Sequence, residues 1–123
     1  MIKIAAYGTL RESDYNFKRM QSYFGDDCIR KVDEIVLPHF KMYNLGYYPC
    51  ITASSDANDI VKFDVLEITK ECHDFIYQME IGAGYTEISV NTEQHGNLLV
   101  YVVPDKYIDK RTPVIESGDW FNK

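Results

Sequence analysis

The sequence predicts a fold that combines β-strands with two α-helices. Apolar residues recur at helical spacing in two segments, near residues 14–24 and 70–82. Elsewhere, apolar residues alternate with polar ones or form short continuous runs, which is the pattern of strands. The chain has 123 residues, of which 46% are hydrophobic and 14% aromatic. This is enough for one packed domain, and we assign residues 1–123 to it.

The first predicted strand spans residues 2–6 and leads into a glycine-containing turn at residues 7–11. Successive N–H groups in such a strand-to-helix turn can converge on an anion. The hydroxyl groups of Tyr7 and Thr9 would add hydrogen-bond donors, and Arg11 would add positive charge. The turn is therefore a candidate cradle for a carboxylate or an oxyanion. The alternative is an ordinary tight turn with Tyr7 packed beneath it.

The first helix is predicted over residues 14–24, with Ser13 or Asp14 as its N-cap and Gly25 at its end. Its apolar face carries Phe17, Met20 and Phe24. Asn16 lies in the first turn of this helix, close to the glycine turn. Its amide either hydrogen-bonds that turn and holds its shape or is an ordinary solvated side chain.

The apolar patterns predict five further strands, at residues 28–37, 40–45, 60–68, 86–91 and 98–103. The last of these is almost continuously apolar, so we expect it at the centre of the sheet. Asp64 interrupts an apolar strand, so its carboxylate lies either on a solvent-exposed face of the sheet or beside a residue with which it is paired. Tyr47 and Tyr48 either line a pocket or belong to the core and its rim. Trp120 is expected to pack on the body of the protein.

The second helix is predicted to begin after Thr69 and to end at Gly82 and Gly84. Its apolar face carries Cys72, Phe75, Ile76 and Met79. One turn after Ile76, Glu80 lies at the edge of this face. Partial desolvation there would raise the pKa of the Glu80 carboxyl group towards the range of a general base. The alternative is a glutamate at a fraying helix end that reaches water.

Composition limits the possible functions. The formal net charge of −6 argues against general nucleic-acid binding and against anionic membrane surfaces. No apolar run is long enough to span a membrane and no signal-peptide pattern is present, so we expect a cytoplasmic protein. Cys28, Cys50 and Cys72 lack CxxC spacing and are expected to be reduced thiols. Nothing pairs Cys50 with a histidine for a cysteine hydrolase, and no two ligands share a metal-binding spacing.

Five landmarks occur in a fixed order along the chain: Tyr7-Gly8-Thr9-Leu10-Arg11 followed by Asn16; Leu45-Gly46-Tyr47-Tyr48-Pro49-Cys50-Ile51; Met79-Glu80 followed by Gly82 and Tyr85; Leu99-Val100-Tyr101; and Ser117-Gly118-Asp119-Trp120. Together they resemble the gamma-glutamylcyclotransferase-like superfamily, in its AIG2-like branch of small bacterial gamma-glutamylamine cyclotransferase-type proteins. The resemblance covers nearly the whole chain. The sequence departs from the family at Phe63-Asp64, where Gly-Glu is usual, and at Ile81-Gly82-Ala83-Gly84, which replaces the usual loop.

The resemblance implies an α+β fold with a small mixed β-barrel and flanking helices. It also implies cleavage of a small-molecule γ-glutamyl substrate with release of 5-oxoproline, without a metal or an organic cofactor. Glu80 would act as general base and acid. The residues that would bind substrate are Tyr7, Gly8, Thr9, Leu10 and Tyr85. The alternative is a ligand-binding or interaction module without turnover. In either case we expect a monomer or a small homo-oligomer.

Overall fold

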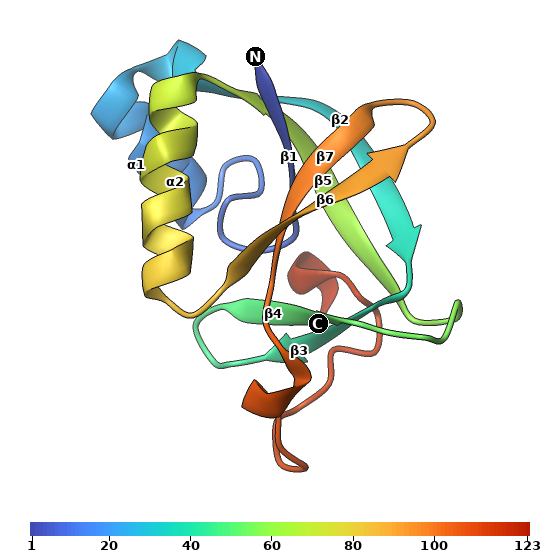
Figure 1. Ribbon diagram of the computed structural model, residues 1–123. Coiled ribbons are helices and arrows are strands. Elements are labelled where there is room, and N and C mark those ends of the chain that lie inside the picture. The colour runs from blue at the N-terminus through green and yellow to red at the C-terminus, as the bar shows by residue number, and fades with distance from the viewer.

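Two β-sheets and two α-helices make up the computed structural model, which describes residues 1–123. The strands are β1 (Ile2–Ala6), β2 (Ile29–Pro38), β3 (Phe40–Asn44), β4 (Pro49–Ala53), β5 (Ile60–Ile68), β6 (Thr86–Thr92) and β7 (Gly96–Val102). The helices are α1 (Tyr15–Phe24) and α2 (Lys70–Gly82), and short 3₁₀ turns occur at Asp26–Cys28, Asp105–Tyr107 and Trp120–Asn122. Figure 1 shows α1 and α2 side by side along one flank of the larger sheet. The predicted α+β class is confirmed.

The larger sheet has the strand order β2-β5-β1-β7-β6. Strands β1 and β7 are parallel, with Ile4 opposite Leu99, and the other neighbours are antiparallel. The apolar β7 therefore lies inside the sheet, as predicted. Strands β3 and β4 form a separate pair in which Met42 lies opposite Ile51. The larger sheet curls, but its edge strands β2 and β6 do not pair, so the expected barrel is an open one (Figure 1).

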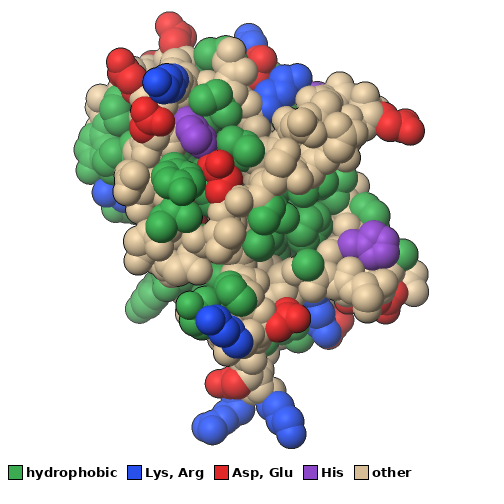
Figure 2. All heavy atoms as spheres, in the orientation of Figure 1, with side chains coloured by type: hydrophobic (Ala, Val, Ile, Leu, Met, Phe, Trp, Pro, Cys, Tyr) green, Lys and Arg blue, Asp and Glu red, His purple; other side chains and the backbone are tan.

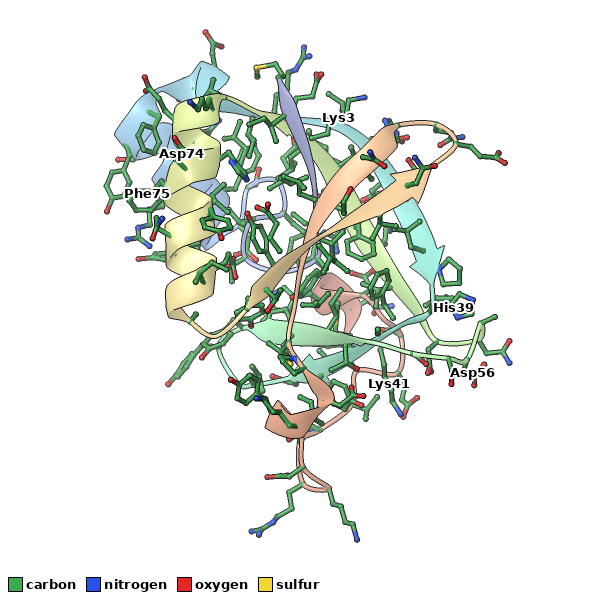
Figure 3. The ribbon with its side chains drawn as sticks, in the orientation of Figure 1. Lys3, His39, Lys41, Asp56, Asp74 and Phe75 are labelled. Carbon is green, nitrogen blue, oxygen red and sulfur yellow. The ribbon has the colours of Figure 1, made fainter.

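The core lies between the curled sheet and the helices. Strand β5 is buried along most of its length, and Phe63 at its centre is fully buried. The helices contribute the buried residues Phe17, Met20, Cys72 and Ile76. Phe75 was predicted on the same face of α2, but it is partly buried beside α1, with its ring centre 5.8 Å from that of Phe24 (Figure 3). On the face shown in Figure 2, hydrophobic side chains also gather between the β6–β7 hairpin and the smaller sheet.

The predicted boundaries differ slightly from the observed ones. Cys28 belongs to the 3₁₀ turn before β2, and β7 already begins at Gly96, directly after the β6–β7 turn. Strand β4 was not among the predicted strands because Pro49 breaks the strand pattern at its start. A proline is tolerated as the first residue of a strand, where its missing N–H costs no hydrogen bond of the ladder.

The C-terminal segment packs against the body of the protein, as predicted from Trp120, which is buried. Gly118 makes the close approach possible, because its φ is +66° and a Cβ atom there would lie 1.9 Å from the carbonyl oxygen of Ile60. The backbone N–H of Lys62 donates to the Gly118 carbonyl over 2.8 Å. Neither α-helix has the length and apolar character needed to cross a membrane.

Candidate active site

A cavity of about 370 Å³ opens between the end of β1, the end of α2 and the start of β4. All six residues predicted to form the site contribute to its wall. The lining residues are Ile4, Ala5, Ala6, Tyr7, Gly8, Thr9, Leu10, Tyr15, Asn16, Tyr47, Tyr48, Pro49, Met79, Glu80, Ala83, Tyr85 and Tyr101. Glu80 is the only acidic residue among them, and no lysine, arginine or histidine lines the cavity.

The loop after β1 is held by its carbonyl groups, and three of its N–H groups are unpaired. The Gly8 carbonyl accepts from the N–H of Arg11 at 3.0 Å, and the Thr9 carbonyl accepts from that of Asn16 at 2.9 Å. The N–H groups of Gly8, Thr9 and Leu10 donate no hydrogen bond within the chain. Unpaired backbone donors of this kind are the feature of an anion-binding loop. The loop therefore has the donors that its sequence predicted.

Gly8 is required in this loop by its neighbour in β4. A Cβ atom at Gly8 would lie 2.8 Å from Cγ and 2.9 Å from Cδ of Pro49. The loop and the start of β4 therefore approach so closely that a side chain would push them apart. The two landmarks that contain Gly8 and Pro49 lie far apart in the sequence and meet at this wall of the cavity.

Asn16 holds the loop from the first turn of α1. Its Nδ2 group donates to Thr9 Oγ1 over 2.7 Å, in addition to the backbone bond to the Thr9 carbonyl. Of the two alternatives for Asn16, the hydrogen bond to the turn is therefore the correct one.

The buried tyrosines use their protons inside the protein. The Tyr7 hydroxyl donates to the carbonyl of Tyr101 at 2.6 Å, and the Tyr85 hydroxyl donates to that of Pro49 at 2.7 Å. Burial also raises the pKa of both phenols well above the usual value, so they stay protonated. The Tyr7 hydroxyl, which was expected to add a donor to the loop, therefore cannot donate to a ligand while its bond to the carbonyl persists, and the same holds for Tyr85. Tyr7 and Tyr85 instead present oxygen acceptors and aromatic walls.

Glu80 lies in the last turn of α2 and is partly buried. Its carbonyl accepts from the N–H groups of Ala83 at 3.1 Å and Tyr85 at 3.0 Å, which fixes the helix end. Its carboxylate makes no ion pair and no hydrogen bond to another side chain. Burial raises the pKa of Glu80 to about 7. A carboxyl group with this pKa can accept a proton and return it near neutral pH.

Arg11 points away from the cavity, contrary to the expectation that it adds positive charge to the loop. The residue is 2% exposed, and its side chain donates to Asp119 at 2.7 Å, Asp64 at 3.3 Å and Glu34 at 3.4 Å. Its guanidinium also lies 4.1 Å from the ring centre of Phe121. Three carboxylates attract the guanidinium to this side more strongly than a neutral cavity wall can.

Asp64 belongs to the same ion cluster and has no contact with the cavity. It is 1% exposed and accepts from Arg11 and, at 2.9 Å, from the backbone N–H of Glu12. Of the two alternatives for Asp64, a carboxylate beside a partner is therefore the correct one. Because Asp64 is absent from the cavity wall, it is poorly placed to replace Glu80 as a base.

Tyr101 was not predicted as a site residue, although it lines the cavity. Its hydroxyl donates to Glu87 Oε2 at 2.7 Å, and the same oxygen lies 2.8 Å from His73 Nε2. The signal in the sequence was a single hydroxyl group within the apolar run of β7. Tyr47 and Tyr48 also line the cavity, and Tyr47 is 94% exposed at its rim.

The structure offers no support for a cysteine nucleophile or a metal centre. Cys50 is fully buried outside the cavity wall, and burial raises the pKa of its thiol to about 11. A thiol with this pKa is protonated near neutral pH and is a poor nucleophile. No group of three or more histidine, cysteine, aspartate or glutamate side chains is arranged to hold a metal ion.

Known proteins share both the sequence pattern and the fold. A curated relative, the provisionally named gamma-glutamylcyclotransferase PH0828 of Pyrococcus horikoshii, is 28% identical over 121 residues, which cover 97% of this chain and 90% of the relative. The crystal structure of PH0828 matches with a TM-score of 0.74 and 25% identity, over 98% of this chain and 90% of that one. A mouse AIG2-like protein matches with a TM-score of 0.70 and 18% identity, over 94% and 86% of the chains.

The same fold also occurs inside a larger protein. Kluyveromyces lactis allophanate hydrolase matches with a TM-score of 0.75 and 14% identity, over 98% of this chain but only 20% of that one. At this identity the likeness concerns the fold alone. The sequence itself matches the family described as gamma-glutamyl cyclotransferase, AIG2-like, over residues 4–122. The chain therefore belongs to the AIG2-like gamma-glutamyl cyclotransferase family.

Proposed function

We propose that the protein cleaves a γ-glutamyl amide and releases 5-oxoproline and an amine. The α-amine of the substrate attacks its own γ-carbonyl carbon, so a C–N bond forms within a five-membered ring and the C–N bond of the amide breaks. The nucleophile belongs to the substrate, and the protein needs no nucleophilic side chain. The observation that carries the proposal is Glu80, an unpaired carboxyl group with a pKa of about 7, in the same cavity as the unpaired loop amides.

Glu80 moves the proton in this reaction. It takes a proton from the α-ammonium group, which makes the amine nucleophilic, and it returns a proton to the leaving amine as the amide bond breaks. Its pKa of about 7 suits both steps, because the group populates both protonation states near neutral pH. No lysine or arginine lines the cavity to lock the carboxyl group in its ionised form.

The loop binds the negative end of the substrate. The N–H groups of Gly8, Thr9 and Leu10 can donate either to the α-carboxylate or to the oxygen that becomes negative during ring closure. A cavity of about 370 Å³ holds the γ-glutamyl group folded, with the amine close to the carbonyl carbon. The free substrate rarely adopts the conformation that allows ring closure, and confinement in the cavity holds it in that conformation.

The alternative is a module of the same fold that binds a ligand without turnover. Its support in the sequence was the replacement of a family glycine by Phe63. Phe63 is fully buried in the core, with its ring centre 5.8 Å from that of Tyr7, and it does not enter the cavity. This departure from the family therefore leaves the cavity open and gives the alternative little support.

The test measures 5-oxoproline release from a panel of γ-glutamyl amides that differ in the leaving amine. Each substrate has a matched control that carries an N-acetyl group, which removes the attacking amine. We expect release from at least one free γ-glutamyl amide and none from its acetylated control. Release of free glutamate from the γ-glutamyl amide, and of N-acetylglutamate from its control, would indicate simple hydrolysis. Binding of 5-oxoproline without any release would favour the non-catalytic module.

A further inference from the structure

The side chain of Asn16 is bonded at one end only. Its Nδ2 group donates to Thr9 Oγ1 at 2.7 Å, while its Oδ1 atom is buried without a hydrogen-bond partner. A buried unpaired polar atom lowers stability, so most such atoms find partners. The opposite orientation of the amide would place an NH₂ group in the same position and leave two donors unpaired. The observed orientation is therefore the better one, and stability alone does not explain an amide at this position.

The hydrogen bond from Asn16 determines whether the Thr9 hydroxyl acts as a donor or as an acceptor towards a ligand. A hydroxyl group has one proton to donate, and here the oxygen already accepts from Asn16. The proton has no acceptor within the chain, and Thr9 is a half-buried residue of the cavity wall. By contrast, the hydroxyl protons of Tyr7, Tyr85 and Tyr101 are all donated inside the protein. Thr9 thus adds a free side-chain donor to the unpaired amides of its own loop.

We infer that Asn16 is a positioning residue that fixes the Thr9 hydroxyl as a donor to an anionic oxygen of the ligand. The chemical group recognised is a carboxylate, as in 5-oxoproline or a γ-glutamyl amide, so the inference rests on the proposed function. An amide suits this task because its NH₂ group can only donate to Thr9. An aspartate would accept the Thr9 proton instead, and its charge would repel the ligand carboxylate.

A double-mutant cycle tests whether Asn16 acts through Thr9. Binding of 5-oxoproline is measured by calorimetry and the Michaelis constant by 5-oxoproline release, for Thr9→Val, Asn16→Leu and the double variant. A hydrogen bond to a charged group corresponds to a loss of about tenfold or more in affinity. We expect each single variant to weaken binding and raise KM by about tenfold, with a smaller change in kcat. The double variant should also lose about tenfold rather than about a hundredfold, because both changes remove the same donor.

Two further variants separate positioning from a structural role. Thr9→Ser keeps the hydroxyl and should retain most of the affinity that Thr9→Val loses. Asn16→Asp should bind 5-oxoproline more weakly than Asn16→Leu at pH 7, and should recover affinity as acidification lets the carboxyl group donate to Thr9 again. Gln21→Leu removes an amide from the same helix outside the cavity and should bind as the native protein does.

The outcomes also separate this inference from the proposed function. Multiplicative losses in the double variant, or native affinity in Asn16→Leu, would overturn the inference even if the native protein releases 5-oxoproline. Failure of the native protein to bind 5-oxoproline would overturn it as well. Conversely, 5-oxoproline binding that depends jointly on Thr9 and Asn16, in a native protein that turns over no γ-glutamyl amide, would overturn only the catalytic proposal.

Discussion

The loop of residues 8–11 connects two regions that contain carboxyl groups, one without a cation and one with the cation of Arg11. On the cavity side, Glu80 has no charged partner, and burial raises its pKa to about 7. At the other end of the loop, Asp64 and Asp119 are bonded to the guanidinium of Arg11 at 3.3 and 2.7 Å. Both regions contain carboxyl groups withdrawn from water. They differ in whether a cation accompanies the carboxylate.

This difference separates a group that can exchange protons from groups that hold the chain in place. Breaking a buried pair of a carboxylate and an arginine by removing one partner is costly. In addition, Asp64 accepts the N–H of Glu12 and lies 3.3 Å from Lys31 Nζ, so the cluster anchors the end of the loop to β5 and β2. The unpaired Glu80 contributes no such anchoring, but it can change its charge near neutral pH. The loop is thus rigidly held at one end and exposed to a titrating group at the other.

The largest effect is expected on turnover when Glu80 loses its acid–base function. Glu80→Gln is nearly isosteric and should keep the fold, while 5-oxoproline release should fall by about 10²–10⁴-fold, the range for general acid–base catalysis. Steady-state release and a thermal midpoint on the same preparation measure both properties. The matched control is Glu71→Gln, an exposed position in the first turn of α2, which should retain turnover. Undiminished release by Glu80→Gln would show that another group moves the proton.

In the region around Arg11, Asp64 and Asp119, a substitution should change the stability of the protein and not its turnover. Arg11→Met removes the cation that Asp64 and Asp119 share, and should lower the free energy of unfolding by about 3–5 kcal/mol, as expected when a buried pair loses one partner. Urea denaturation measures this loss. The control is Arg30→Met, which removes an arginine that is 70% exposed and pairs with Glu67 on the surface. That change should lower stability by less than about 1 kcal/mol. Equal losses in the two variants would show that the Arg11 cluster is no more important than a surface pair.

The sequence predicted the unpaired region better than the paired one. Glu80 follows from local information, since helical periodicity places it at the edge of the buried face and the glycines after it end the helix. The direction of Arg11 depends on Asp119, which is 108 positions away in the sequence, and no local pattern contains that contact. The same holds for the hydroxyl of Tyr7, whose acceptor is the carbonyl of Tyr101.

The fold shows a similar division between local and long-range information. Both helices and most strands follow from periodicity within short segments. Strand β4 was missed because Pro49 interrupts the pattern, and its position is fixed by pairing with β3 and by contact with Gly8. Whether the larger sheet closes depends on the distance between β2 and β6, which are its two edge strands. That distance depends on the curl of all five strands and not on any one of them.

A smaller effect should appear in the pH dependence of stability. Because burial raises the pKa of Glu80 to about 7, the folded protein binds more protons than the unfolded chain between about pH 4.5 and 7. The contribution of this group to stability is therefore complete at low pH and is lost as the pH rises through about 7. Glu80→Gln should match the native protein near pH 4.5 and exceed its stability by at most about 3 kcal/mol at pH 8. Urea titrations across this range measure the difference, and a constant difference would mean that Glu80 is not desolvated.

The smallest effect is expected at a carboxylate that is paired but exposed. Asp33 Oδ2 lies 2.7 Å from His95 Nε2, which joins β2 to the β6–β7 turn across the open side of the sheet. On its other side, His95 Nδ1 lies 3.4 Å from Nζ of Lys3, which Figure 3 shows near the start of β1. The hydrogen bond between Asp33 and His95 lowers the pKa of Asp33, so its stabilising contribution is present above the unfolded pKa of about 4 and disappears as the pH falls through the lower folded value. A double-mutant cycle of Asp33→Asn and His95→Leu at pH 7 and pH 3 should give a coupling energy that is detectable at pH 7, well below the loss in Arg11→Met, and smaller still at pH 3. A coupling energy as large as the loss of stability in Arg11→Met would mean that burial does not explain the importance of the Arg11 cluster. The contrast between the Glu80 region and the Arg11 region would then depend only on the presence of a cation.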